Sequence, residues 1–378
     1  TSGTSNLRLG VNAGNSIASG GNYNVVLGDE AGTAITTGDN NVAIGFEALS
    51  TEDANGNNVA VGYRSLKTLN AGAEGYTTAV GLDSGTSLTT GVRNTIMGAF
   101  AGDALTDADY NVAIGYAALT TDTKGSQSTA VGYEALLTQN FTSSANSQNT
   151  AVGYRAGTAI TTGEQNTIVG SISGDALTVG GSNVSLGYYS LSADTQGSNS
   201  TAIGRASLAN QNFTSATNSY NTAVGAQSGA QVTTGTLNTL IGGLAGDALT
   251  IGNSNVAVGT SALTTDTAGD QNTAIGINAL QVQNFSSTTD SNNTAVGAEA
   301  GADVTTGVSN TLLGKSAGAN FTDADYNVAV GADALLGDHL GSKSTAVGTS
   351  ALAVQDFDSA TDANNTAVGF HAGVAVTT

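Results

Sequence analysis

The pentapeptide Asn41-Val-Ala-Ile-Gly45 decides how this chain folds, because close copies of it return about every seventeen residues. Twenty copies end on a glycine, from Gly28 to Gly369, and a looser copy stands at Asn6-Leu-Arg-Leu-Gly10. A short repeat that persists along a chain is typical of a solenoid, in which one structural unit stacks on the next. We therefore expect residues 1–378 to form a single elongated domain of about 20 to 21 coils.

The spacing of the motif glycines has a second level. Most coils are 17 residues long, but every fourth coil has 21, or 19 in the first block, so that four coils generally total 72 residues. The glycines at equivalent places in this 72-residue super-repeat are Gly81, Gly153, Gly225, Gly297 and Gly369. Extra residues that leave the motif intact are expected in a loop on one side of the stack.

The motif itself predicts a strand. With the motif glycine as position zero, positions −3 and −1 are apolar or β-branched and position −2 is usually Ala, which is the period-two pattern of a strand. Asn dominates position −4, where it can form a ladder between coils or serve as a turn residue. Apolar residues at +7, such as Ile35 and Leu88, predict a second short strand. The fold class is therefore all-β, a parallel β-solenoid or β-roll.

Position −2 suggests how chains associate. We expect −3 and −1 to fill the roll and −2 to point outward, which makes a face of small residues with a bulky one in every fourth coil. Such a face packs closely, so we predict that it meets other copies of the same chain. The alternative is that −2 lines an interior layer of a single solenoid. The bulky residues predicted to face the partner copies are Val26, Ile96, Ile168, Leu240 and Leu312.

Composition and charge exclude several classes of function. The net charge is −20, with only nine Lys and Arg, so no basic patch for nucleic acid is expected. The chain has no Cys, which excludes disulfides and Cys-ligated zinc. No apolar stretch is long enough to span a membrane. The sequence starts without Met and stops in mid-pattern, so we expect it to be part of a longer fibre.

The repeats resemble those of a known family. Asn-Val-Ala-Ile-Gly at residues 41–45 and 111–115, and Asn-Thr-Ala-Val-Gly at 149–153 and 221–225, closely resemble the head repeats of trimeric autotransporter adhesins. They are also similar to β-roll repeats in phage tail fibres and bacterial surface fibres. The resemblance covers residues 6–378. It implies a β-roll packed as a homotrimeric rod, and an extracellular adhesive or spacer role at a cell or virion surface.

Few residues suggest chemistry. His339 and His371 do not recur in other repeats and are expected to be surface residues, so we predict no enzyme. Acidic residues cluster in two corresponding coils, where hard oxygen ligands could hold Ca²⁺; the alternative is a solvated turn, and no other cofactor is predicted. These calcium candidates are Asp103, Asp107, Asp109, Asp323 and Asp325.

The long coils carry a recurring Phe in a polar loop. Either the rings form a row of contacts for sugars or partner proteins, or each ring folds over the end of its own coil and shields the core. The candidate surface contacts are Asn140, Phe141, Asn212, Phe213, Asn284, Phe285 and Phe357.

These observations favour one function with two alternatives. The main expectation is a structural or adhesive segment of an extracellular trimeric fibre, an adhesin head or shaft that projects a binding tip or contacts a surface. Its partners would be copies of itself and host-surface glycans or proteins. The alternatives are a phage tail-fibre shaft and a passive filament or matrix protein that binds no ligand.

Overall fold

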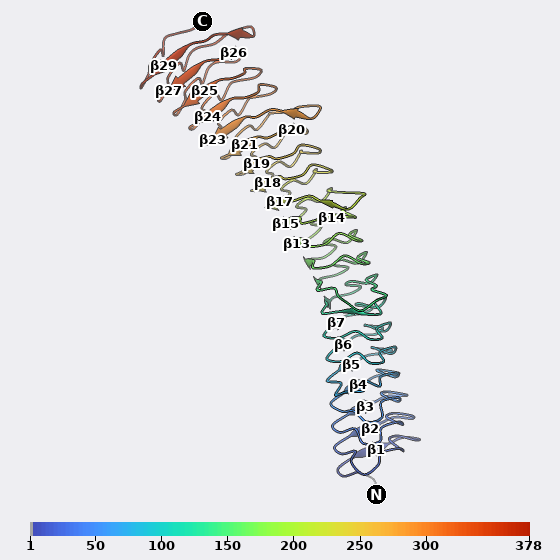
Figure 1. Cartoon of the computed structure of the whole chain (residues 1–378). Helices are drawn as coiled ribbons and strands as arrows, with labels where there is room; N and C mark the ends of the chain where they lie inside the picture. The colour runs from blue at the N-terminus through green and yellow to red at the C-terminus, as the bar shows by residue number, and fades with distance from the viewer. Residues whose placement is uncertain (1–2) are drawn as a thin grey trace. The chain divides into compact units, whose positions relative to one another are not determined.

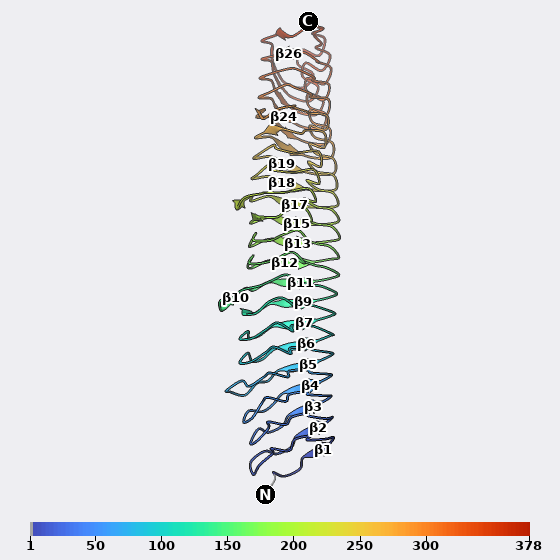
Figure 2. The same cartoon turned by 90° about the vertical axis from the view of Figure 1, so that its right-hand side faces the viewer.

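The computed structural model describes residues 3–378 and has only strands, with no helix in that range. The chain divides into two compact units, one that ends at Ser185 and one that begins at Leu186. In each unit, nearly every turn of the solenoid contains one short strand of the main sheet. Successive turns lie on top of one another (Figures 1 and 2). The prediction of an all-β parallel β-solenoid is confirmed, with neighbouring turns mostly 17 residues apart.

The strands of the first unit are short. Those of its main sheet are β1 (Leu7–Leu9), β2 (Val25–Leu27), β3 (Val42–Ile44), β4 (Val59–Val61), β5 (Thr78–Val80), β6 (Thr95–Met97), β7 (Val112–Ile114), β9 (Thr129–Val131), β11 (Thr150–Val152) and β12 (Thr167–Val169). Beside them stand β8 (Gly125–Ser126) and β10 (Ala145–Asn146), while β13 (Val184–Leu186) spans the unit boundary in the sequence.

The second unit repeats this pattern. Its main strands are β15 (Thr201–Ile203), β17 (Thr222–Val224), β18 (Thr239–Ile241), β19 (Val256–Val258), β21 (Thr273–Ile275), β23 (Thr294–Val296), β24 (Thr311–Leu313), β25 (Val328–Val330), β27 (Thr345–Val347) and β29 (Thr366–Val368). Its two-residue strands are β14 (Gly197–Ser198), β16 (Thr217–Asn218), β20 (Gly269–Asp270), β22 (Thr289–Asp290), β26 (Gly341–Ser342) and β28 (Thr361–Asp362).

Within each unit, main strands of successive turns pair in parallel, and like positions stand opposite one another. Val42, for example, is paired with Val59, and Ile44 with Val61. The two-residue strands pair separately, as β8 does with β10. The loop that ends in β10 reaches beyond the neighbouring turns in Figure 2, which agrees with the prediction that the extra residues of a long coil form a loop on one side.

The motif glycine is required by the closeness of the turns. Gly45 has φ of 132°, in a region that L side chains rarely adopt. A Cβ atom added to Gly45 would collide with the carbonyl oxygen of Gly62 on the next turn. Because backbone rather than a flexible side chain is in the way, the position accepts only glycine.

The side chains at −2 point into the solenoid, so the prediction that they face partner copies is wrong. The five bulky residues are completely buried within the single chain: Val26, Ile96, Ile168, Leu240 and Leu312. Strand residues at −3 and −1 are instead half-buried or exposed. The interior is narrow enough for Ala43 to fill it at −2, together with Ala48 and Leu49 after the motif glycine. The alternative, an interior layer at −2, describes the structure.

The interior side chains of successive turns fit together in a fixed order. Turns whose +4 residue is Gly leave space that a neighbouring turn fills. A Cβ added at Gly157 would lie 3.2 Å from Leu136 Cδ2 on the preceding turn and 3.1 Å from Ile168 Cδ1 on the following one. Gly229 stands in the same way between Leu208 and Leu240. A bulky −2 residue is therefore accommodated by the glycine of the turn beside it.

The Asn residues at −4 form a ladder that runs mainly from side chain to backbone. Some turns add a direct side-chain bond, as where the amide of Asn166 donates to Asn149 Oδ1 at 3.2 Å. Asn24 Oδ1 accepts the backbone N–H of Asn41 at 2.9 Å, and Asn41 Oδ1 accepts that of Asn58 at 3.0 Å. The side-chain amide of Asn41 also donates to the carbonyl of Asn55 within its own turn, at 3.1 Å. Each Asn therefore joins two turns and closes a corner.

The prediction of a second strand at +7 is wrong. Ile35 and Leu88 are buried, but they lie outside any strand. The short second strands stand a few residues later, as β8 does, and in the described residues they occur only where a long coil supplies a partner.

Candidate functional site: the outward face of the sheet

The outward face of each main sheet is a row of aliphatic side chains. Position −1 contributes one from every turn, and β-branched residues at −3 flank it. Met97 is 42% exposed, Ile241 40% and Leu313 47%. Since parallel pairing keeps like positions in register, the row continues through every turn of each unit. It is an apolar surface that the single chain leaves partly open to solvent, since most residues at −1 are half-buried.

An aromatic column stands beside this row in the first unit, at position +1. The rings of Tyr116 and Tyr133 are stacked, with centroids 5.4 Å apart and planes 11° from parallel. Tyr133 and Tyr154 are also 5.4 Å apart, at 12°. Phe100 packs its edge against Tyr116, at 5.9 Å between centroids. The three tyrosines are about half exposed, so the column is a surface feature.

Charged groups lie next to the column. A hydrogen bond to the Glu134 carboxylate and the negative charge of that group raise the pKa of Tyr133. Glu134 Oε2 in turn lies 3.4 Å from Arg155 Nε, an ion pair without hydrogen-bond geometry. The middle phenol of the column therefore has a carboxylate within reach of its proton.

A second exposed group of aromatic side chains is arranged differently. The guanidinium of Arg93 lies between Tyr76 and Tyr110, with its central carbon 5.9 Å and 5.4 Å from the two ring centroids. Arg93 also donates a hydrogen bond to the Tyr110 hydroxyl at 3.0 Å. Here a cation separates two tyrosines two turns apart, whereas in the column the phenol rings touch directly.

The recurring Phe rings are not surface contacts. Phe141, Phe213 and Phe285 are 6–7% exposed, and Phe357 is half-buried. The ring of Phe141 packs over β8, where a Cβ added to Gly125 would lie 2.9 Å from it. Of the two possibilities, the exposed row is therefore wrong for the first three rings, and a ring that shields its own coil describes them.

The Asn beside each ring is more accessible. Asn140, Asn212 and Asn284 each accept a hydrogen bond from a Thr hydroxyl of the preceding turn, at 3.1–3.2 Å. These Asn side chains thus hold the loop against its neighbour.

Beneath the ring lies a buried polar network that the sequence analysis missed. Asp122 is fully buried, and its Oδ1 accepts the backbone N–H groups of Gly125 and Phe141, each at 3.0 Å. Its Oδ2 accepts from the side chain of Gln139 at 2.5 Å. The bond from the Gln side chain to Oδ2 recurs at Asp194, Asp266 and Asp338. The available signal was that Asp and Gln occupy +7, where other coils have Ile or Leu.

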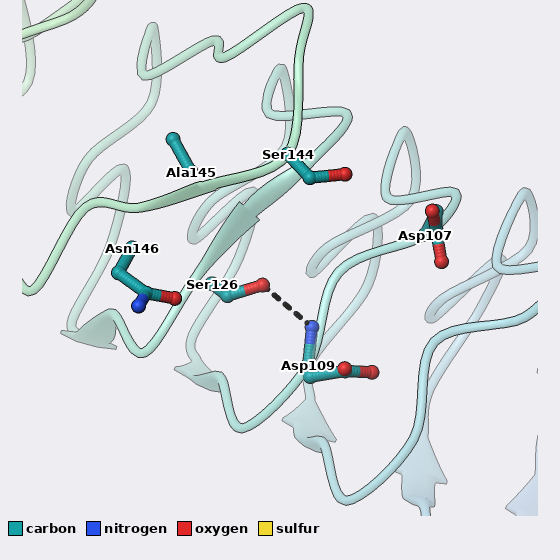
Figure 3. A pocket seen from close by; sticks show the side chains of 6 residues that line it. All are labelled: Asp107, Asp109, Ser126, Ser144, Ala145 and Asn146. Carbon is teal, nitrogen blue, oxygen red and sulfur yellow. Dashed lines mark hydrogen bonds between the residues drawn. The ribbon is translucent and has the colours of Figure 1, made fainter.

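The calcium candidates are only partly brought together. Asp107 and Asp109 line one hollow of about 340 Å³ with Ser126, Ser144 and Asn146 (Figure 3). One oxygen of Asp107 accepts from Thr90, and one of Asp109 accepts the backbone N–H of Val92, each at 2.7 Å.

The other three calcium candidates do not line this hollow. Asp103 does not line the hollow; it accepts a hydrogen bond from Thr120. Asp323 and Asp325 repeat the bonds of Asp107 and Asp109, to Thr306 and to the backbone of Val308. Among residues 3–378, no three His, Cys, Asp or Glu side chains are grouped as a metal site.

The two histidines are both at the surface. His339 Nδ1 lies 2.7 Å from Asp356 Oδ1 in an exposed pair, and His371 stacks on Phe370 at 4.0 Å between ring centroids. In the described part of the chain, no helix has the length and apolar character that a membrane span requires.

The comparisons with known proteins add no relative. No protein-family model matches the chain, and no curated protein matches it either.

Proposed function

We propose that this chain is a structural or adhesive segment of an extracellular fibre, in which three copies associate through the outward faces of their sheets. The fibre would stand at a cell or virion surface and be built from the 72-residue super-repeat of four turns. The proposal includes no catalysis and no cofactor.

One observation carries the proposal: an open row of aliphatic side chains runs through every turn of each unit. Soluble proteins rarely leave a contiguous apolar patch larger than a few hundred Å² uncovered. A row that repeats on every turn is matched in length and spacing by the same row of another copy. The interface we propose therefore uses residues such as Met97, Ile241 and Leu313, in place of the buried residues at −2.

The number of chains in the assembly tests the self-association. Native mass spectrometry and light scattering of the purified chain should give three copies, and Ile241→Glu combined with Leu313→Glu should give single chains. The matched control is Thr260→Glu, an exposed residue just past the following strand β19. A wild-type chain that stays monomeric at micromolar concentration would refute the trimer.

Binding assays distinguish the adhesive role from the other two. We expect the trimer to bind cells or a glycan array, with host-surface glycans or proteins as partners. A trimer that binds neither would favour the passive filament. Immunogold labelling of intact cells and of virions then separates a cell-surface fibre from a tail-fibre shaft. Melting temperatures measured as calcium is added test the absence of a cofactor.

A further inference from the structure

The stacked tyrosines of the first unit have the geometry of a covalent modification site. Tyr116, Tyr133 and Tyr154 come from three consecutive turns, and register fixes their spacing, since Ile114, Val131 and Val152 are paired across β7, β9 and β11. We propose that this column is an oxidative cross-linking site, at which a peroxidase and hydrogen peroxide join tyrosines of adjacent turns as dityrosine.

Proximity and access both favour the reaction. The centroids in each pair are 5.4 Å apart and the planes lie within 12° of parallel, so each pair of phenol rings is held face to face at close range. Exposed fractions of 48%, 43% and 52% for Tyr116, Tyr133 and Tyr154 leave the phenols open to a small oxidant. Holding two reactants side by side makes their coupling effectively unimolecular.

The chemistry balances with one named oxidant. Each phenol loses one electron and one proton, and together the two electrons and two protons reduce hydrogen peroxide to two waters. The two ring radicals form one carbon–carbon bond, and the two ring protons displaced from those carbons return to the phenol oxygens. The Glu134 carboxylate, hydrogen-bonded to Tyr133, accepts the proton as that phenol is oxidised.

Other exposed aromatic side chains of the same chain serve as internal controls for the column. Tyr76 and Tyr110 are as exposed as the column, at 54% and 51%, but the guanidinium of Arg93 lies between them. Phe46 stacks on Tyr63 at 5.4 Å, yet Phe has no phenol to oxidise. Oxidation should therefore couple Tyr133 to either neighbour and leave these other rings uncoupled.

Peptide mapping locates the product. Trypsin releases residues 94–124, which hold Tyr110 and Tyr116, and residues 125–155, which hold Tyr133 and Tyr154. After brief treatment of the native protein with a haem peroxidase and hydrogen peroxide, we expect two products. One is the 125–155 peptide lighter by two hydrogen atoms, and the other is that peptide joined to 94–124 through Tyr116.

Two variants and a denatured control make the test decisive. Tyr133→Phe keeps the stacked ring but leaves Tyr116 and Tyr154 two turns apart, so it should abolish both mapped products; the contact of Tyr188 with Tyr189, at 6.1 Å between centroids, lies outside these peptides. Tyr110→Phe should leave the yield of both products unchanged. Protein oxidised in guanidinium should lose the preference for Tyr133, and denaturing gels should show the native product at the mass of one chain.

Three results would overturn the proposal. These are native protein oxidised at its tyrosines without coupling, mapped column products that survive Tyr133→Phe, and cross-links that join Tyr110 or different chains in preference to the column. Circular dichroism of Tyr133→Phe establishes that a loss of the mapped products reflects the missing phenol and not an unfolded chain.

Discussion

Asp122 and Gln139 stand at the same position of consecutive turns, and the buried carboxylate of the first accepts a 2.5 Å hydrogen bond from the amide of the second. Gln139 Oε1 also accepts from Asn149 on the next turn, at 2.9 Å. One side chain therefore connects three turns at the base of the long loop, where an aliphatic core residue would connect none through hydrogen bonds.

Breaking this connection should lower the stability of the fold, and the first repeat block of the chain suggests a compensating substitution. Gln139→Leu leaves Oδ2 of Asp122 without its partner, which should lower the stability of the fold by about 1–3 kcal/mol, the cost of a buried acceptor left unsatisfied. In the first repeat block, Leu69 stands in place of Gln, and Glu52 reaches the backbone N–H groups of Asn55 and Ala71.

The double variant Asp122→Glu with Gln139→Leu copies this native pair and should recover part of the loss. Thermal unfolding followed by circular dichroism measures both changes. A double variant no more stable than Gln139→Leu would show that the longer carboxylate does not take over the role of the amide.

The fit between turns predicts a contrast between two glycines. In Gly229→Ala the new Cβ would lie 2.7 Å from Leu240 Cδ1 and 2.9 Å from Leu208 Cδ2, at φ of 58°. We expect a loss of about 1–2 kcal/mol from the left-handed backbone and about 1–3 kcal/mol from overpacking. Gly243→Ala meets nothing within 4 Å and should change stability by less than about 0.5 kcal/mol. Equal melting temperatures for the two variants would contradict this account.

Two neighbouring residues test which face of the strand is inside. Leu240→Ala removes a completely buried side chain and should cost about 2–5 kcal/mol. Ile241→Ala changes a side chain that is 40% exposed and should cost less than about 1.5 kcal/mol in the single chain. The comparison requires conditions in which the chains are dissociated, since an assembly would bury Ile241. A larger loss of stability in Ile241→Ala than in Leu240→Ala would support the arrangement expected from the sequence, with −1 inside and −2 outside.

The acidity of Asp103 predicts a stability change that depends on pH. Burial raises the pKa of Asp103 above its ordinary value of 3.8, although the hydrogen bond from Thr120 acts in the opposite direction. The folded state therefore binds this proton more tightly than the unfolded state, so the charged carboxylate destabilises the fold at neutral pH and the penalty disappears as pH falls through the raised pKa.

Asp103→Asn stays neutral and can still accept from Thr120. It should melt higher than wild type at neutral pH, by an amount that shrinks towards zero near pH 3.8. Melting temperatures of both proteins over a pH series measure this difference. A difference that stays constant over that range would contradict a role for the carboxyl proton.

The regular parts of this fold follow from local pattern. Val42, Ala43 and Ile44 alternate as a strand requires, and the spacing of Gly45 and Gly62 gives the stacking directly. The alternation does not determine which face of the strand is inside. It places Ala43 on the opposite face from Val42 and Ile44, but either face could point to the core. The larger aliphatic residues suggested −3 and −1, but the interior is too narrow for them once Leu49 and Ala48 are placed there.

The stacked tyrosines and the buried Phe rings could not be predicted from the sequence for a different reason. The stacking of Tyr116, Tyr133 and Tyr154 depends on register and on how each ring leaves its strand, although their shared position +1 was visible in the sequence. Burial of Phe141 depends on how its loop folds back over Gly125, which no local pattern specifies.

The enclosure of Gly229 between Leu208 and Leu240 limits how the gene can change length. Slippage during DNA replication readily deletes or duplicates a repeat. Losing only the turn that carries Gly229 would bring both leucines into space meant for one, whereas losing a complete set of unlike turns would restore every neighbour relation. We expect natural length variants of such chains to differ by whole sets of turns, which makes fibre length a stepwise inherited trait.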